Sequence, residues 1–72
     1  MNERIGKLLN RSGGAFYEGF LGSPNTVRFT EEELETFVEL IVRECVDTLL
    51  WHGCDDAVPY IEWMAQNKLG VK

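Results

Sequence analysis

The stretch TEEELETFVELIVRECVDTLLWHG, residues 30–53, decides the fold. Its opening TEEE matches a capping box, in which the side chains of Thr30 and Glu33 each bond the backbone N–H of the other residue. The acidic residues also lie where the helix dipole is positive, and Gly53 can end a helix. The stretch therefore predicts a long helix that begins after Thr30 and ends near His52.

The apolar residues of this helix form one broad stripe when they are placed at helical spacing. The stripe comprises Leu34, Phe37, Val38, Ile41, Val42, Cys45 and Leu49. We expect it to face the core. Val46 and Leu50 widen it, so the helix carries more apolar surface than one short partner helix can cover. A second protomer is the simplest cover, which predicts a homodimer or larger oligomer through this helix.

A shorter helix is predicted on the N-terminal side, over NERIGKLLNR, residues 2–11. Asn2 is a possible N-cap, and Ser12, Gly13 and Gly14 stop the helix. Its apolar face consists of Ile5, Leu8 and Leu9.

A third helix is predicted over residues 55–70, with Asp55 or Asp56 as its cap, Pro59 in the first turn and Gly70 as the stop. Its inner face is expected to hold Val58, Ile61, Ala65 and Leu69, broadened by Tyr60, Trp63 and Met64.

Residues 15–29 lie between the first two helices. AFYEGF and TVRFT favour strands, and LGSPN between them favours a turn, which predicts a small β-hairpin. An irregular loop is the alternative, because Gly19 and Gly22 weaken a strand. The whole chain, 1–72, is thus expected to be one mainly α domain: three helices with a small β-hairpin after the first.

Composition and charge exclude several classes of protein. The chain is 44% hydrophobic and 26% charged, as in an ordinary soluble domain. A net charge of −5 argues against general nucleic-acid binding. No apolar run matches a membrane span and no secretory signal is seen, so we expect a cytoplasmic protein with reduced cysteines.

The charge is unevenly distributed along the chain. Residues 1–28 carry four basic and two acidic residues, a balance of +2, whereas residues 29–56 carry nine acidic residues against Arg43, a balance of −8. Any anionic ligand should therefore bind to the first third.

The segment SGGAFYEGFLGS, residues 12–23, suggests a ligand site in that third. Glycine allows backbone N–H groups to approach a phosphate, aromatic rings stack on bases, and arginines donate paired hydrogen bonds. The predicted nucleotide-binding residues are Arg11, Gly13, Gly14, Phe16, Tyr17 and Arg28. The alternative is a flexible connection whose aromatic residues pack in the core.

Other constellations have simpler explanations. Cys45, His52 and Cys54 match no standard zinc spacing, and Cys45 and His52 lie about 10 Å apart along a helix, too far for direct proton transfer. The acidic TEEELE is a candidate mimic of a nucleic-acid backbone, but we favour a well-capped helix start, because capping explains these residues without further assumptions. We therefore expect no enzyme, no metal and no cofactor.

The pieces NERIGKLLNRSG, FVELIVREC and LGVK resemble parts of small accessory proteins of T-even-like tailed bacteriophages. The resemblance implies a protein used for host takeover or against bacterial defences, in the cytoplasm of an infected bacterial host. With the site above, it suggests sequestration of a nucleotide-type immune signal at an oligomer interface. The alternative is a protein–protein inhibitor that binds a host protein through the same aromatic segment or through Trp51 and Trp63.

Overall fold

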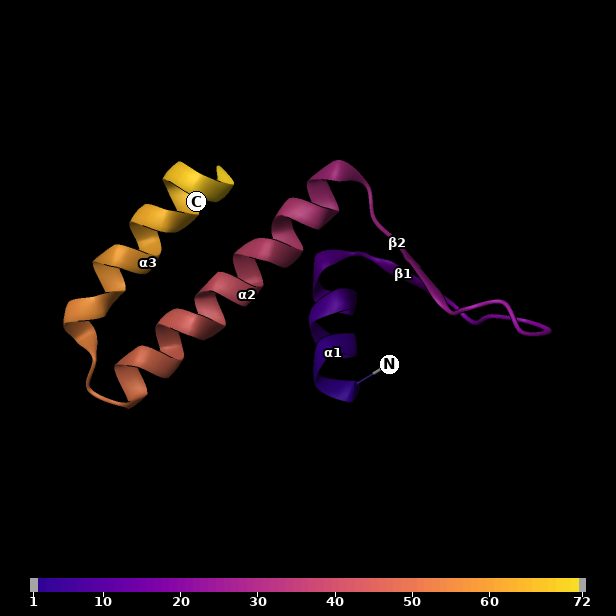
Figure 1. Cartoon of the computed structure of the whole chain (residues 1–72), viewed down its shortest axis with the longest axis horizontal. Coiled ribbons are helices and arrows are strands. Elements are labelled where there is room, and N and C mark those ends of the chain that lie inside the picture. The colour runs from indigo at the N-terminus through magenta and orange to yellow at the C-terminus, as the bar shows by residue number, and fades with distance from the viewer. Residues whose placement is uncertain (1, 72) are drawn as a thin grey trace. The chain divides into compact units, whose positions relative to one another are not determined.

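The computed structural model describes residues 2–71, and within them the chain forms three helices and a small antiparallel sheet (Figure 1). The order is α1 (Glu3–Ser12), β1 (Ala15–Tyr17), β2 (Thr26–Arg28), α2 (Glu31–Trp51), η1 (Asp55–Ala57), α3 (Val58–Met64) and η2 (Ala65–Leu69). The predicted mainly helical fold with a hairpin after the first helix is confirmed. The residues divide into two compact units, Met1–Phe37 and Val38–Lys72.

Helix α1 begins and ends as predicted. The side-chain oxygen of Asn2 accepts hydrogen bonds from the backbone N–H groups of Arg4 and Ile5, at 2.8 and 3.3 Å. At the other end Gly13 has a φ of 86°, the left-handed conformation that glycine adopts without strain. The N–H groups of Gly13 and Gly14 bond to carbonyls of the last turn, which completes a Schellman motif.

The first unit packs around Leu9, which is buried in the last turn of α1. A Cβ on Gly14 would collide with the Cδ1 atom of Leu9 and lie 2.6 Å from the ring of Phe29. The rings of Phe29 and Phe37 lie 5.3 Å apart between centroids, so the start of α2 joins this cluster. Gly14 is therefore a packing requirement of the unit.

The hairpin pairs β1 with β2 in an antiparallel register, Ala15 with Arg28, Phe16 with Val27 and Tyr17 with Thr26. This favours the hairpin over the irregular loop. Each strand is only three residues long, and the eight residues from Glu18 to Asn25 connect them.

Helix α2 begins with the predicted capping box. The Thr30 hydroxyl accepts from the Glu33 N–H at 3.1 Å, and a Glu33 carboxylate oxygen accepts from the Thr30 N–H at 2.8 Å. At the far end Gly53 has a φ of 70°, and the Cys54 N–H bonds to the Leu49 carbonyl at 2.8 Å. A second Schellman motif thus stops the helix where the sequence predicts it.

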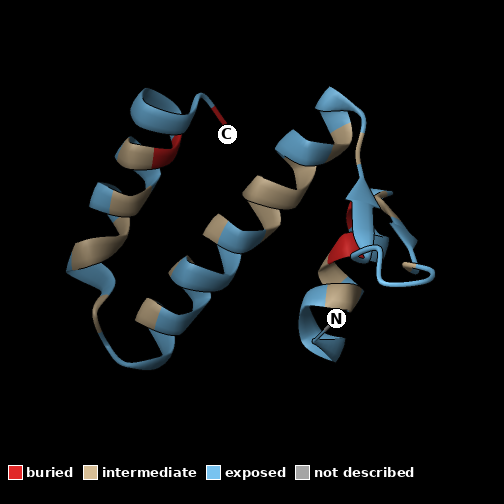
Figure 2. Cartoon of the chain, turned by 45° about the vertical axis from the view of Figure 1, so that its right-hand side comes forward, coloured by how far each residue is buried: buried red, intermediate tan, exposed pale blue. Residues whose placement is uncertain are grey.

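The expectation that the α2 stripe faces a core holds only in part, since Phe37, Val38, Val42 and Leu49 are half-buried. None of the 21 residues of α2 is buried, and Leu34, Ile41 and Cys45 of the stripe are exposed (Figure 2). In the second unit, α3 runs back along α2 (Figure 1) and half-buries only one flank, which includes Val42 and Val46. A single helical segment beside α2 contacts one flank only, so the rest of α2 in this unit is left uncovered.

Residues 55–69 are helical throughout, but in three successive geometries: a 3₁₀ turn, an α-helix and a π turn. The predicted cap by Asp55 or Asp56 is wrong, since both fall inside the 3₁₀ turn and neither η1 nor α3 has a side-chain cap bond. Pro59 lies in the first turn of α3, as predicted, and Gly70 ends the π turn with a φ of 70°.

The inner face of this helical segment is narrower than expected. Ala65 is buried, whereas Val58, Ile61 and Met64 are half-buried. The other residues assigned to that face are exposed, namely Tyr60, Trp63 and Leu69. The reason is the same as for α2: two helices side by side have only one contact line between them.

Candidate functional site

Two of the predicted ligand-binding residues lie together on the hairpin. Tyr17 and Arg28 project from the same face of the sheet, because Arg28 pairs with Ala15, two residues from Tyr17. The Arg28 guanidinium carbon lies 5.2 Å from the centroid of the Tyr17 ring, a cation–π contact. Both side chains are exposed, so this face offers a ring and a cation to solvent.

Phe16 lies on the opposite face of the sheet, because neighbouring residues of a strand alternate in direction. It is partly exposed and borders a shallow hollow against α1. The other lining residues of that hollow are Asn2, Glu3, Gly6, Leu9 and Asn10. Phe16 and Tyr17 therefore do not stack on one base from this sheet.

The backbone N–H groups of the two glycines predicted to bind phosphate are already hydrogen-bonded within the protein. The N–H of Gly13 bonds to the Asn10 carbonyl at 3.2 Å, and that of Gly14 to the Leu9 carbonyl at 3.0 Å. Glu33 places a carboxylate oxygen 2.8 Å from the position of a Cβ on Gly13. This carboxylate repels an anion, and neither amide is free to bind one.

Arg11 is exposed in the last turn of α1, where a cation is favourable next to the negative end of the helix dipole. It lies on a different element from Arg28. The structure thus brings together Tyr17 and Arg28 and gives Arg11, Gly13, Gly14 and Phe16 separate surroundings.

The loop of the hairpin holds a feature that the sequence reading did not single out. Phe20 is 77% exposed and Leu21 is 89% exposed. Leu21 has a φ of 51° and Gly22 a φ of 84°, and the Ser23 N–H bonds to the Phe20 carbonyl at 3.1 Å. Positive φ at both central residues is the pattern of a type I′ turn, and a leucine there is strained.

The loop also has internal contacts below the turn. The Asn25 side-chain oxygen accepts from the Gly19 N–H at 2.7 Å. A Cβ on Gly19 would collide with the Ser23 carbonyl oxygen and meet Pro24 at 2.8 Å, so the two sides of the loop touch at this glycine. The turn signal LGSPN locates the loop, but it does not reveal that Phe20 and Leu21 project from it.

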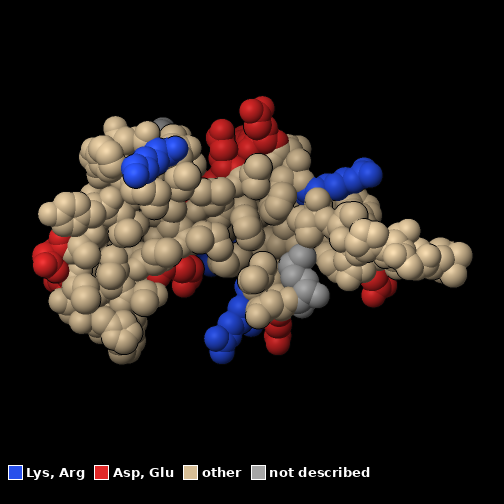
Figure 3. All heavy atoms as spheres, viewed as in Figure 1, with Lys and Arg blue, Asp and Glu red and all other residues tan. Residues whose placement is uncertain are grey.

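Residues 19–27 carry no charge, and the end of the hairpin that is visible in Figure 3 shows neither basic nor acidic atoms. We call Phe20 and Leu21, with the turn that carries them, the apolar tip.

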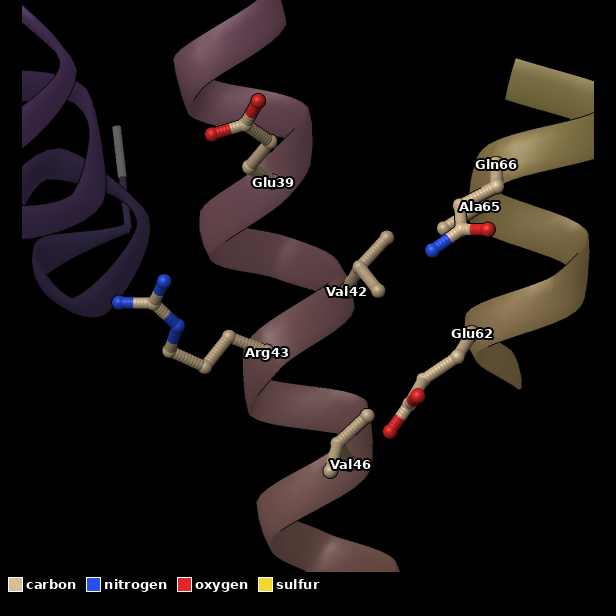
Figure 4. A pocket seen from close by; sticks show the side chains of 7 residues that line it. All are labelled: Glu39, Val42, Arg43, Val46, Glu62, Ala65 and Gln66. Atoms are coloured by element: carbon tan, nitrogen blue, oxygen red, sulfur yellow. The ribbon is translucent and has the colours of Figure 1, made fainter. Parts of the chain in front are cut away.

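The second unit has two hollows between α2 and α3. One, of about 250 Å³, is lined by Val42 and Val46 of α2, by Glu62 of α3 and by Ala65 and Gln66 of η2. Figure 4 shows the two valines pointing toward α3, whereas Glu39 and Arg43 leave α2 on the side away from it.

The other hollow, of about 380 Å³, lies along the opposite side of the α2–α3 pair. We call it the apolar groove. Its lining residues are Ile41, Glu44, Cys45, Thr48, Leu49 and Ile61.

The remaining candidates are surface features. Trp51 is 88% exposed and Trp63 is also exposed. Cys45 and Cys54 are free thiols. Among the residues described, no three His, Cys, Asp or Glu side chains are grouped in a way that could hold a metal ion. No helix within residues 2–71 combines the length and apolar character needed to cross a membrane.

Comparison with family models, with curated proteins and with solved structures found no match for this chain.

Proposed function

We propose that this chain is a non-catalytic binding protein that captures a partner protein through the apolar tip. The observation that carries the proposal is the exposure of Phe20 and Leu21 on a loop whose shape is fixed by hydrogen bonds. With the resemblance to phage accessory proteins, it suggests an inhibitor of a host or defence protein in an infected bacterium.

A fixed apolar tip suits capture for two physical reasons. A few side chains buried in pockets of the partner supply most of the energy of a protein interface, and aromatic residues such as Phe20 are enriched in interface cores. A loop that already has its bound shape loses little entropy on binding, and the Gly19–Asn25 bond and the turn at Leu21 provide that shape.

The strain at Leu21 points the same way. A leucine with positive φ costs about 1–2 kcal/mol relative to an ordinary backbone, and such strain is typical of functional sites. Glycine at this position would remove the strain and would also remove the apolar side chain. Retaining leucine in a solvent-exposed turn is explained if the side chain contacts a partner.

The test is capture of a partner from host lysate, identification of that partner, and measurement of its affinity with purified proteins. Leu21→Asn removes the apolar side chain but keeps a residue that tolerates positive φ, so the loop retains its shape. We expect Leu21→Asn and Phe20→Ser each to weaken binding by on the order of 30-fold. Trp51→Ala is the matched control, because it removes an equally exposed ring from the other unit.

Two results would refute tip-mediated capture. One is unchanged affinity in both tip variants. The other is a loss confined to Trp51→Ala, which would move the partner surface to the second unit. A homo-oligomer through α2 belongs to the same proposal, because it would present two tips to one partner and raise the apparent affinity.

Sequestration of a nucleotide is the second candidate, favoured by the Arg28–Tyr17 contact. A base stacked on the Tyr17 ring with its phosphate on Arg28 would use both groups. The test is thermal unfolding with a panel of cyclic and linear nucleotides. Ligand at 100 times its dissociation constant adds about 2.7 kcal/mol to stability.

Point variants distinguish nucleotide binding from protein capture. Arg28→Ala should abolish a nucleotide-dependent shift in melting temperature and leave capture by the apolar tip intact. Arg11→Ala tests whether the second predicted arginine takes part. The absence of any shift across the panel would eliminate this candidate.

A further inference from the structure

The hollow between α1 and the hairpin is a candidate ligand site in the first unit. Its volume is about 340 Å³, at the lower end of the range for pockets that bind small molecules. Every residue that lines it lies within residues 2–16, so the hollow belongs to one compact unit. We call it the Gly6 notch, after the glycine that lies between the other α1 residues of the lining.

The notch contains a glycine that the fold itself does not require. Gly6 lies within α1 and its φ is not positive. A Cβ at this position would meet nothing within 4 Å, so alanine would fit. Glycine is one of the least favourable residues inside a helix. Its presence here is explained if a bound molecule approaches the helix backbone closely, which an absent Cβ allows.

The other lining residues supply an aromatic ring and polar groups from two elements. Phe16, on the hairpin, is 42% exposed. Glu3, Gly6 and Asn10 follow one another on α1 at steps of three and four residues, so they lie along one side of the helix. The side chains of Glu3 and Asn10 are exposed, so their polar atoms can bond a ligand that lies over Gly6.

The chemistry of these groups favours a neutral ligand with hydroxyl groups and a ring. Among the lining residues Glu3 alone carries a charge, so the notch repels anions. A carboxylate only accepts hydrogen bonds, whereas a side-chain amide both donates and accepts. Hydroxyl groups of a sugar donate to a carboxylate in many nucleotide sites. A phenylalanine ring offers a flat apolar face on which a base or a sugar ring can pack.

We infer that the Gly6 notch binds a neutral ligand that contains a sugar, with the hydroxyl groups on Glu3 and Asn10 and a ring against Phe16. A nucleoside and a free sugar share this chemistry: the base packs on Phe16 in the first, and the sugar ring itself in the second. The notch lies on the opposite face of the sheet from the Tyr17–Arg28 pair. It also does not include the apolar tip, so each proposal can fail alone.

The test is titration of the full-length chain, followed by NMR, with two sets of probes. Adenosine, cytidine and uridine represent nucleosides, and ribose and glucose represent free sugars. We expect shifts of the Gly6 and Asn10 amides and of the Phe16 ring, with a dissociation constant on the order of 0.1–1 mM. Shifts with the nucleosides alone assign the site to a nucleoside, and shifts with the free sugars at similar affinity assign it to a sugar.

Gly6→Ala is the variant that separates binding from folding. It places a methyl group in the notch and should weaken binding by on the order of 10-fold, while raising the melting temperature because alanine favours a helix. Misfolding cannot produce a more stable protein that binds less. Lys7→Ala is the matched control, because it introduces the same residue one position along α1 at a site that does not line the notch. It should bind like the wild type.

Glu3→Gln tests the proposed hydrogen bond to the sugar. It keeps the shape of the side chain and removes the charge, so it should weaken binding by on the order of 10-fold. Arg28→Ala should leave binding in the notch unchanged, because Arg28 does not line it.

Three results would overturn the assignment. The first is the absence of shifts at Gly6, Asn10 and Phe16 with every probe up to about 10 mM. The second is a Gly6→Ala protein that binds like the wild type. The third is a set of shifts centred on Tyr17 that Arg28→Ala abolishes, which would place the ligand on the opposite face of the sheet.

Discussion

Replacing Gly14 by alanine tests whether this glycine serves packing, as the first unit indicates, or is held open for a ligand. Gly14 has no positive φ, so alanine is compatible with its backbone. The added Cβ, however, would collide with the Cδ1 atom of Leu9 and lie 2.6 and 2.9 Å from two atoms of the Phe29 ring. Leu9 is 3% exposed, so its side chain is packed on most sides.

Two opposing terms set the magnitude. Overpacking a core by one methyl group costs about 1–3 kcal/mol. Alanine also restricts the unfolded chain, which returns about 0.4–1 kcal/mol. The net expectation is a loss of about 1.3 kcal/mol in the free energy of unfolding, within a range of about 0–2.6 kcal/mol, which is several degrees in melting temperature for a chain of 72 residues.

The assay is thermal and urea unfolding followed by circular dichroism, with amide exchange of α1 to confirm that the loss lies in the first unit. Gly6→Ala is the matched control. Gly6 lies within α1 and a Cβ there would meet nothing within 4 Å, so alanine should stabilise by about 1 kcal/mol. In a Leu9→Ala background, Gly14→Ala should cost much less, because the colliding side chain is gone.

A Gly14→Ala protein that melts above the wild-type temperature refutes the packing role of Gly14. That role is also refuted if Gly14→Ala costs as much in the Leu9→Ala background as alone.

Other expectations concern the caps and the loop. Thr30→Ala should lower the free energy of unfolding by about 1 kcal/mol in urea titrations, because it removes the capping box. Thr36→Ala, within α2, is the control and should be neutral or slightly stabilising. Equal losses in the two variants would contradict the role of Thr30 as a cap. Asn25→Ala should speed exchange of the Gly19 amide in NMR, since it removes the acceptor at 2.7 Å, and unchanged protection would show that another group holds the loop. Leu21→Gly should leave the free energy of unfolding unchanged or raise it by up to about 1 kcal/mol, measured by urea titration. A clear fall would show that the positive φ at Leu21 carries no strain.

Local signals in the sequence predicted the element boundaries well. Asn2, the Thr30–Glu33 capping box and the stop glycines at 13, 53 and 70 all act through partners a few residues away, so the sequence contains both sides of each interaction. The hairpin was also predictable, because LGSPN lies between two short strand-forming runs.

The candidate site was harder to predict, because it depends on the directions in which the side chains point. Strand alternation alone separates Phe16 from Tyr17, and applying that rule to the predicted hairpin would have shown it. The crowding of Gly13 and Gly14 could not be read from the sequence, since it comes from Glu33 and Phe29, which lie on later segments. Asp55 and Asp56 lie inside a 3₁₀ turn, whereas the sequence is equally compatible with a helix that either residue caps.

The packing of Gly14 between Leu9 and Phe29 has a consequence for how the chain is made. The contacts that hold the first unit all lie within residues 1–37, from the Schellman motif of α1 to the approach of Glu33 to Gly13, which are 20 residues apart. Small domains fold within about a second or faster. Synthesis proceeds at about 5–20 residues per second, so the first unit can form while α3 is still being translated. The nascent chain would then expose its apolar tip before the second unit is complete.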